Sequence, residues 1–332
     1  MALKIAINGF GRIGRCVARI TATRSDVEIV AINDMASMDM MLYLLKNDSV
    51  HGTFKGNVEQ IDNENISING KKIRVFSDRD PKNLNFAECG ADVVLECTGV
   101  FLSQKDAQIH IDKGIKKVLF SAPAKDDTPT FVIGVNEHLY AGQKIVSNAS
   151  CTTNCLGPIA KVLDDAFGIQ KGLMTTIHSY TNDQNILDVK HSKDKRRARA
   201  GAINMIPTTT GAAKAIGLVL PQLKGKLHGQ SVRVPTPNVS MVDLNVIVKR
   251  KTTIEEVTAV FNKAAEGSFS GIILMDKEMR VSQDFVGCEY SSIVAEDLTQ
   301  VIEGDMVKIM AWYDNEWGYS TRLIDMAIYI SK

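Results

Sequence analysis

The chain has 332 residues, 45% of them hydrophobic and 23% charged, a balance typical of a globular protein with two domains or one large domain. Its formal net charge of +1 creates no overall field that would attract nucleic acid or an anionic membrane. The first residues, MALKIAINGFGR, lack the apolar region of a signal peptide, and we find no uncharged apolar run of the roughly 18 residues that a membrane span requires.

A glycine-rich motif follows the first predicted strand. Residues 3–7 form a short apolar run, and the sequence NGFGRIGR comes directly after them. Its glycines, Gly9, Gly11 and Gly14, have G-x-G-x-x-G spacing and lead into a predicted helix. Glycines in this pattern permit a tight turn and let the backbone approach a pyrophosphate. The motif therefore predicts a dinucleotide site, with a glycine turn that binds no ligand as the alternative.

The second predicted strand, residues 27–32, is followed by an acidic side chain. Asp34 lies 25 residues beyond Gly9, close to the spacing at which a carboxylate accepts the ribose hydroxyls of a dinucleotide. A carboxylate at this position would repel a 2′-phosphate, so the sequence favours NAD over NADP as the cofactor.

The next segments continue the alternation of strands and helices. Asn69-Gly70 predicts a hairpin turn, and residues 92–97 and 117–120 are typical of buried strands with a helix between them. Thr98-Gly99 and Ser121-Ala122 follow these strands, at the carboxyl ends where open parallel sheets bind ligands. The same residues are equally typical of turns, and their function is left open.

A cysteine begins the next predicted helix, within SNASCTTNC. Apolar residues recur at helical spacing over residues 156–167, so Cys151 would lie in the first turn. Free N–H groups and the helix dipole favour a negative charge there, and a thiolate is the nucleophilic form of cysteine. The alternative is a small buried cysteine. The six cysteines have no C-x-x-C spacing, which argues against a zinc or disulfide framework and favours a cytoplasmic, reducing setting.

Three later segments carry groups that could serve this cysteine. His178 follows a predicted strand at residues 172–177 and could raise the thiolate fraction of Cys151, or form only a structural hydrogen bond. The sequence PTTTG at residues 207–211 and Arg233 could bind anions, although each is also common in a purely structural role. A strand over residues 307–313 precedes DNEWGYS and a final amphipathic helix.

A basic run, KHSKDKRRAR, occupies residues 190–199. It could bind nucleic acid, but no aromatic residue is interleaved for base stacking, so we favour a solvated or subunit-facing loop. A zinc site from Cys151, Cys155 and His178 is a further hypothesis, and it lacks an evident fourth ligand.

Seven segments together resemble the phosphorylating glyceraldehyde-3-phosphate dehydrogenase family. They are INGFGRIGR, AIND, SNASCTTNC, GLMTTIHSYTNDQ, PTTTGAAKA, RVPTPNVS and WYDNEWGYS, in the family's order over nearly the whole chain. The resemblance implies an α/β fold, with a Rossmann NAD-binding domain at residues 1–150 completed by a C-terminal helix at 316–332. A mixed α/β catalytic domain would occupy residues 151–315, and the assembly would be a homotetramer.

The resemblance also implies an activity and residue roles. The activity is NAD-dependent oxidation of glyceraldehyde 3-phosphate with inorganic phosphate to 1,3-bisphosphoglycerate, a glycolytic step, through a thioester on the nucleophile Cys151 with His178 as its base. The cofactor contacts, besides the three glycines, would be Arg12, Ile13, Asp34, Arg79, Ser121 and Asn315. The substrate and phosphate contacts would be Ser150, Thr152, Thr181, Thr210, Gly211 and Arg233. No residue is assigned to a metal.

One departure from the family pattern concerns the cofactor. Val189-Lys190 stand before His191, where many members have Leu-Pro in a loop beside the adenosine end of the cofactor. This departure leaves the tolerance of NADP open, whereas Asp34 supports NAD. Two competing functions are also open: oxidation of another phosphorylated aldehyde such as erythrose 4-phosphate, and nucleic-acid binding by the basic run.

Overall fold

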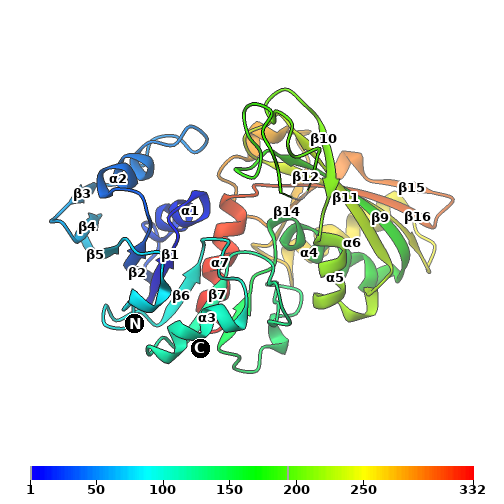
Figure 1. The fold of residues 1–332 in the computed structure, drawn as a ribbon. Coiled ribbons are helices and arrows are strands. Elements are labelled where there is room, and N and C mark those ends of the chain that lie inside the picture. The colour runs from blue at the N-terminus through cyan, green and yellow to red at the C-terminus, as the bar shows by residue number, and fades with distance from the viewer. Residues whose placement is uncertain (1, 193) are drawn as a thin grey trace. The chain divides into compact units, whose positions relative to one another are not determined.

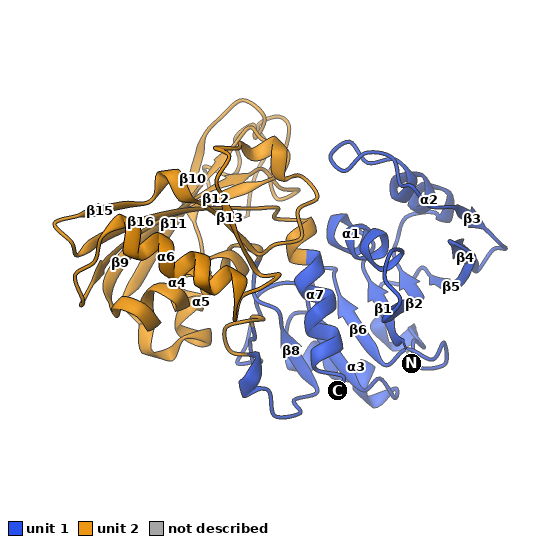
Figure 2. Ribbon diagram, turned by 180° about the vertical axis from the view of Figure 1, so that it is seen from behind, with its two compact units in different colours: residues 1–131, 137–150, 320–332 blue, residues 132–136, 151–319 orange. Residues whose placement is uncertain are grey.

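The computed structural model describes residues 2–192 and 194–332, and the chain divides into two compact units (Figure 2). Unit 1 comprises Met1–Phe131, Glu137–Ser150 and Ser320–Lys332, and unit 2 comprises Val132–Asn136 and Cys151–Tyr319. Among the described residues, no helix combines the length and the apolarity needed to cross a bilayer.

Unit 1 is built on a sheet whose strands follow the order β3-β4-β5-β2-β1-β6-β7-β8 (Figure 1). The six strands from β5 to β8 in this order pair in parallel, while β3 and β4 pair antiparallel. The strands are β1 (Leu3–Asn8), β2 (Val27–Asn33), β3 (Val58–Gln60), β4 (Asn65–Ile68), β5 (Lys71–Phe76), β6 (Val93–Glu96), β7 (Lys117–Phe120) and β8 (Ile145–Ser147). The helices are α1 (Arg12–Thr21), α2 (Met38–Lys46) and α3 (Gln104–Asp112), with residues 320–329 of α7 (Trp317–Tyr329).

The strand order of unit 1 defines where a ligand can bind. Strand β1 has β2 on one side and β6 on the other, so the direction of winding reverses between β1 and β6. Open parallel sheets bind ligands at such a reversal, beyond the carboxyl ends of the strands. The predicted doubly wound fold is thereby confirmed, and so is the Asn69-Gly70 hairpin, whose two residues have φ of 53° and 79° and join β4 to β5.

Unit 2 contains a mostly antiparallel sheet in the order β10-β11-β9-β12-β16-β14-β13, with β15 on β16. Its strands are β9 (Ile169–Ser179), β10 (Ile206–Thr209), β11 (Leu227–Val234), β12 (Ser240–Val248), β13 (Ile273–Asp276), β14 (Ser292–Ala295), β15 (Gln300–Ile302) and β16 (Met306–Tyr313). Its helices are α4 (Cys151–Phe167), α5 (Ala212–Val219), α6 (Ile254–Glu266) and the first turn of α7. Helix α4 packs on β9, β12, β14 and β16 and touches α5 and α6.

Side chains along the strands of unit 2 point alternately to the two faces of the sheet, and this alternation determines which of them face α4. On β9, Met174, Thr176 and His178 are buried on one face, while Leu173 is 66% exposed on the other. Strands β12 and β16 follow the same alternation, and their apolar residues cover the buried face. Strand β9 extends to Ser179, so His178 lies within the strand and not after its end, a small correction to the sequence-based boundary.

Candidate active site

A cavity of about 460 Å³ lies in unit 1, at the carboxyl ends of its parallel strands. Four of the residues predicted to contact the cofactor line it: Gly9, Gly11, Asp34 and Arg79. The other lining residues are Asn8, Asn33, Met35, Asp78, Leu84, Cys97, Thr98, Val100 and Phe101. The cavity therefore occupies the place that the reversal of strand order predicts for a ligand.

The three glycines of the motif differ in what surrounds them. Gly9 has a φ of 96°, and a Cβ there would lie 2.7 Å from the backbone nitrogen of Thr98. A Cβ on Gly14 would lie 2.4 Å from the carbonyl oxygen of Gly9. Gly11 has only open space within 4 Å, at the start of α1, and no side chain caps this helix. Backbone N–H groups at such a helix terminus suit a pyrophosphate, so these residues fit a dinucleotide.

Asp34 is held at the edge of this cavity by two backbone groups. Its carboxylate accepts hydrogen bonds from the N–H of Phe10 at 2.7 Å and of Ala36 at 2.9 Å. Each bond uses a different oxygen, so lone pairs remain on both for ribose hydroxyls. Asp34 thus fixes the turn after β1 and lines the cavity with a negative charge.

The remaining predicted cofactor residues do not line this cavity. Arg12 pairs with Asp48, and this interaction helps to lower the Asp48 pKa to about 2 against the opposing effect of burial. Ile13 is half-buried in α1, and Gly14 packs against the turn. Ser121 lies beyond β7, where its hydroxyl bonds to the Cys97 thiol. Asn315 belongs to unit 2, where its side-chain oxygen accepts from Ser240 at 2.7 Å, leaving its amide nitrogen as the possible ligand donor.

A buried polar chain beneath the cavity links the ends of four strands. The Glu96 carboxylate accepts hydrogen bonds from Asn8 at 2.6 Å and from the backbone and hydroxyl of Thr98. Asn8 in turn accepts from Asn33 at 2.8 Å, and Asn33 bonds to the backbone of Asp78. Burial raises the Glu96 pKa to about 7 despite these donors. Sequence reasoning missed this group, although a carboxylate within the apolar run VVLEC was a signal.

The thiol of Cys151 and the imidazole of His178 meet in unit 2. The sulfur lies 3.5 Å from Nε2, because Cys151 begins α4 and His178 points from β9 toward that helix terminus. His178 is 4% exposed. The ring edge of Tyr313 packs against it, and the Tyr313 hydroxyl bonds to those of Thr152 at 2.9 Å and Thr176 at 2.8 Å. The pair is therefore held by a packed, hydrogen-bonded wall.

Arg233 lies directly beside this pair. Strand β11 runs parallel to β9 in a register that places Arg233 opposite His178. Its Nη1 is 2.6 Å from Nδ1 of His178 and 3.0 Å from the carbonyl oxygen of Ser179. Among the described residues no carboxylate forms an ion pair with Arg233, and burial lowers its pKa. A half-buried cation without a carboxylate partner is well suited to an anionic ligand.

The pKa values of Cys151 and His178 are governed chiefly by burial and by the charge of Arg233. Burial raises the pKa of the Cys151 thiol, and the largest opposing influence is the charge of Arg233, followed by hydrogen bonds from Thr152. Burial and Arg233 together lower the pKa of His178 to about 3. Burial thus disfavours the charged form of each group, while the charge of Arg233 favours the thiolate. Cys155 is fully buried, with its sulfur 3.9 Å from the Ala311 carbonyl oxygen.

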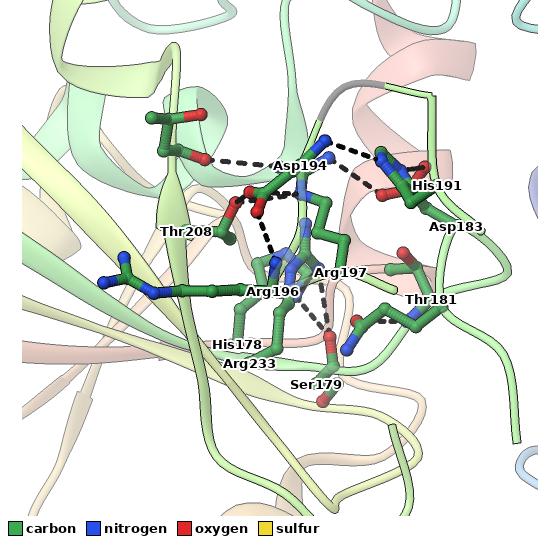
Figure 3. A network of polar contacts seen from close by, with 12 residues as sticks. His178, Ser179, Thr181, Asp183, His191, Asp194, Arg196, Arg197, Thr208 and Arg233 are labelled. Atoms are coloured by element: carbon green, nitrogen blue, oxygen red, sulfur yellow. Dashed lines mark hydrogen bonds and ion pairs between the residues drawn. The ribbon is translucent and has the colours of Figure 1, made fainter. Parts of the chain in front are cut away.

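The loop between β9 and β10 gathers further polar groups around Arg233 (Figure 3). Arg197 bonds to Asp183 at 2.8 Å and to the Thr208 hydroxyl at 2.8 Å, and Asp194 accepts from Thr208. Thr181 lies half-buried near the start of this loop. The sequence included Arg197 only in its basic run, where the alternation of Asp, Lys and Arg did not reveal an inward-facing arginine.

These contacts also bear on the basic run. Arg197 is paired with Asp183 and Arg199 with Asp188, both at 2.8 Å, so two of the three arginines of the run have a carboxylate partner. Arg196 is exposed and points away from the network in Figure 3, and Lys193 lies outside the described residues. The loop is therefore organised by internal ion pairs.

The other predicted anion contacts lie at helix termini. The Thr210 hydroxyl accepts from the N–H of Ala212 at 3.2 Å, and Gly211, the residue before α5, has open space where a Cβ would lie. Ser150 immediately precedes α4. Thr152 is 4% exposed, and its hydroxyl is bonded to that of Tyr313.

A parallel nucleotide-binding sheet and a thiol–imidazole pair beside a half-buried arginine define a dehydrogenase that reacts through a cysteine. Two family models match the chain: the glyceraldehyde 3-phosphate dehydrogenase NAD-binding domain over residues 3–104 and the C-terminal domain of the same enzyme over residues 150–315. The chain belongs to the glyceraldehyde-3-phosphate dehydrogenase family.

Individual relatives match the chain over almost its full length. It is 55% identical to glyceraldehyde-3-phosphate dehydrogenase 1 of Bacillus cereus, covering 99% of this chain and 98% of the relative. It is 53% identical to the enzyme of Geobacillus stearothermophilus, covering 100% and 99%. Identity to the chloroplastic form B of Pisum sativum is 55%, covering 99% and 74%. The family and the NAD-binding domain predicted from the sequence are thereby confirmed.

Proposed function

We propose that the protein catalyses the NAD-dependent oxidative phosphorylation of glyceraldehyde 3-phosphate to 1,3-bisphosphoglycerate, a step of glycolysis. The observation that carries this proposal is the Cys151 sulfur 3.5 Å from Nε2 of His178, beside the uncompensated charge of Arg233. The names of the relatives support the same activity. Residues 1–150 with the C-terminal helix would form the NAD-binding domain, and residues 151–315 the catalytic domain.

The chemistry begins with proton transfer between Cys151 and His178. Cys151 gives its proton to His178 as its sulfur adds to the aldehyde carbon, and His178 passes that proton to the carbonyl oxygen, which yields a hemithioacetal and restores the neutral imidazole. His178 then takes the hydroxyl proton of this adduct as a hydride leaves its carbon. NAD, when bound, supplies the hydride acceptor. The product on Cys151 is a thioester, which inorganic phosphate attacks to release the acyl phosphate.

Two anions must bind near this sulfur, one on the substrate and one as the attacking phosphate. For the substrate phosphate we assign Thr181 and Arg233, because Arg233 lacks a carboxylate partner among the described residues. We also assign Arg197 to the substrate phosphate. Its hydrogen bonds to Asp183 and to the Thr208 hydroxyl hold its side chain in place. For the attacking phosphate we assign Ser150, Thr152, Thr210 and Gly211, at the N-termini of α4 and α5.

Arg12, Ile13, Ser121 and Asn315 remain proposed cofactor contacts. A small rearrangement of the Arg12–Asp48 pair would free the guanidinium for the cofactor phosphates. Asp34 supports NAD over NADP, since its charge lies in the cavity wall.

We also propose a homotetramer. Four large apolar side chains stand out on the loop between β9 and β10: Ile186, Leu187, Ile203 and Met205 are 75–81% exposed. Leu173 adds a further exposed apolar group on the open face of the unit 2 sheet. Exposed apolar side chains in such number on one loop favour association with other copies of the chain. A cytoplasmic location is supported by the six free thiols.

The test is spectrophotometric. Purified protein with NAD should form NADH from glyceraldehyde 3-phosphate, and the rate should fall sharply when phosphate is omitted. Erythrose 4-phosphate should give a lower kcat/KM. A phosphate-independent rate, or preference for erythrose 4-phosphate, would contradict the proposed reaction. Light scattering of the same sample would reveal a monomer if the proposed assembly were wrong.

A further inference from the structure

Asn315, one of the proposed cofactor contacts, has only one end of its side-chain amide engaged within the protein. Its oxygen Oδ1 accepts a hydrogen bond from the hydroxyl of Ser240 at 2.7 Å. Among the described residues, its nitrogen Nδ2 has no hydrogen-bond partner. Asn315 is 7% exposed, so the orientation of its amide decides whether a ligand meets a donor or an acceptor.

The Ser240 hydroxyl is constrained on its other side. Its oxygen accepts a hydrogen bond from the backbone N–H of Ser179 at 3.1 Å. Because an N–H group can only donate, the hydroxyl must direct its own proton elsewhere, and Oδ1 of Asn315 is the acceptor within reach. Ser240 is 1% exposed, at the first position of β12, so water has almost no access to it. The direction of the hydrogen-bond chain from Ser179 to Asn315 is therefore set by the protein.

Turning the Asn315 amide over would leave this chain unsatisfied. Nδ2 would then donate to the Ser240 oxygen, and the hydroxyl proton of Ser240 would lose its acceptor in a buried position. An unpaired buried donor shifts such an equilibrium by roughly tenfold or more. The structure therefore favours the arrangement in which Nδ2 is presented to a ligand.

The backbone of Asn315 is held independently of its amide. One carboxylate oxygen of Asp314 accepts hydrogen bonds from the N–H groups of Glu316 at 2.9 Å and Trp317 at 2.7 Å. These bonds fix the turn between β16 and α7, on which Asn315 lies. Ser240 therefore has only one motion to restrain, the rotation of the amide.

We propose that Ser240 is a positioning residue that holds the Asn315 amide with its nitrogen toward the cofactor, where it donates to the carboxamide oxygen of the nicotinamide. This proposal rests on the proposed function, in which Asn315 contacts NAD. The chain begins at Ser179, whose carbonyl oxygen lies 2.7 Å from Nδ1 of His178. One residue at the end of β9 thus ties the imidazole and the amide to the same point of the backbone.

The test compares two ligands that share the adenosine and pyrophosphate groups. NAD carries the nicotinamide and ADP-ribose lacks it, so only NAD can use Asn315. In calorimetric titration, Ser240→Ala should raise the Kd for NAD by about tenfold and keep the Kd for ADP-ribose within about twofold of the wild type. General damage to the structure would weaken both ligands.

Two further variants make the comparison specific. Asn315→Ala should raise the Kd for NAD, and adding Ser240→Ala to it should cause no further rise, because the hydroxyl acts through the amide. Ser292→Ala is the matched control, since the Ser292 hydroxyl is buried in the same unit and donates to the carbonyl oxygen of Cys155 at 2.7 Å. Its ratio of the two Kd values should equal that of the wild type.

The wild-type protein provides a separate measurement if Ser240→Ala fails to fold. In 3-acetylpyridine adenine dinucleotide, the carboxamide oxygen is kept and the NH₂ is replaced by a methyl group. A presented Nδ2 needs only that oxygen, so the Kd should lie within about threefold of the Kd for NAD. A presented Oδ1 would need the missing NH₂, and the Kd should then rise by about tenfold or more.

The proposal is overturned if Ser240→Ala leaves the Kd for NAD unchanged or weakens NAD and ADP-ribose equally. It is also overturned if the wild type binds the acetylpyridine analogue at least about tenfold more weakly than NAD. If any of these results occurs while the wild type forms NADH from glyceraldehyde 3-phosphate and phosphate, the role of Ser240 is wrong and the proposed function stands. If the wild type forms no NADH from these substrates, the proposed function itself fails.

Discussion

Two single replacements by alanine, at Gly11 and at Gly14, should distinguish an effect on cofactor affinity from an effect on stability. A Cβ on Gly14 would lie 2.4 Å from the Gly9 carbonyl oxygen, well inside the distance that real Cβ atoms keep from a backbone atom. The backbone must shift to relieve this overlap, which we expect to cost about 1–3 kcal/mol, as overpacking does elsewhere. Gly11 has open space on all sides and an ordinary φ of −71°, so Gly11→Ala should change stability by roughly 0.5 kcal/mol or less.

The two variants should behave oppositely toward NAD. The methyl group of Gly11→Ala would occupy the space at the start of α1 where a pyrophosphate must approach the backbone, so the Kd for NAD should rise by at least about tenfold. Gly14→Ala should mainly lower the midpoint of urea unfolding. Calorimetric titration of NAD and urea unfolding of both variants provide the measurements. Wild-type NAD affinity in folded Gly11→Ala would refute the assignment of this cavity to the dinucleotide.

Cys151→Ser should abolish NADH formation and retain NAD binding. Cys155→Ser should keep most of the activity, because the Cys155 sulfur is fully buried. Comparable inactivation by both substitutions would contradict this distinction. His110 is buried against Phe86, and burial followed by the charge of Lys113 lowers its pKa from 6.5 to about 4, so stability should fall by roughly 3 kcal/mol as pH drops from about 6.5 to 4. His110→Leu should flatten that slope in urea unfolding measured across this pH range, and an unchanged slope would exclude His110 as its source. Asp34→Asn should raise kcat/KM for NADP relative to NAD, and an unaltered ratio would mean that the carboxylate does not set the preference.

Much of the candidate site could be predicted from local sequence patterns. The strand, glycine turn and helix around Gly9 are contiguous in the chain, so spacing alone indicated a dinucleotide site. Cys151 begins α4 as the apolar periodicity predicted, and the strand containing His178 was recognised. These features depend on neighbours a few residues apart, which explains why they could be predicted.

Features that depend on strand register were not predictable. Arg233 lies opposite His178 because β11 pairs with β9, across 55 residues of intervening chain. Nothing in the local sequence fixes that pairing. The chain from Glu96 to Asn8 likewise arises where separate strands end side by side. The opposing effects of burial and of Arg233 on the pKa of Cys151 were likewise not revealed by the sequence pattern.

The chain order of unit 1 has a consequence for synthesis on the ribosome. Its last segment, Ser320–Lys332, is tied to earlier parts of the same unit: Arg24 pairs with Asp325 at 2.8 Å, and the Tyr140 hydroxyl donates to the Ile330 carbonyl at 3.1 Å. Asp325 and Ile330 follow unit 2 in the chain, so they emerge from the exit tunnel only after unit 2 has been synthesised. The nascent sheet of unit 1 must therefore wait for the entire intervening unit before its final helix can dock.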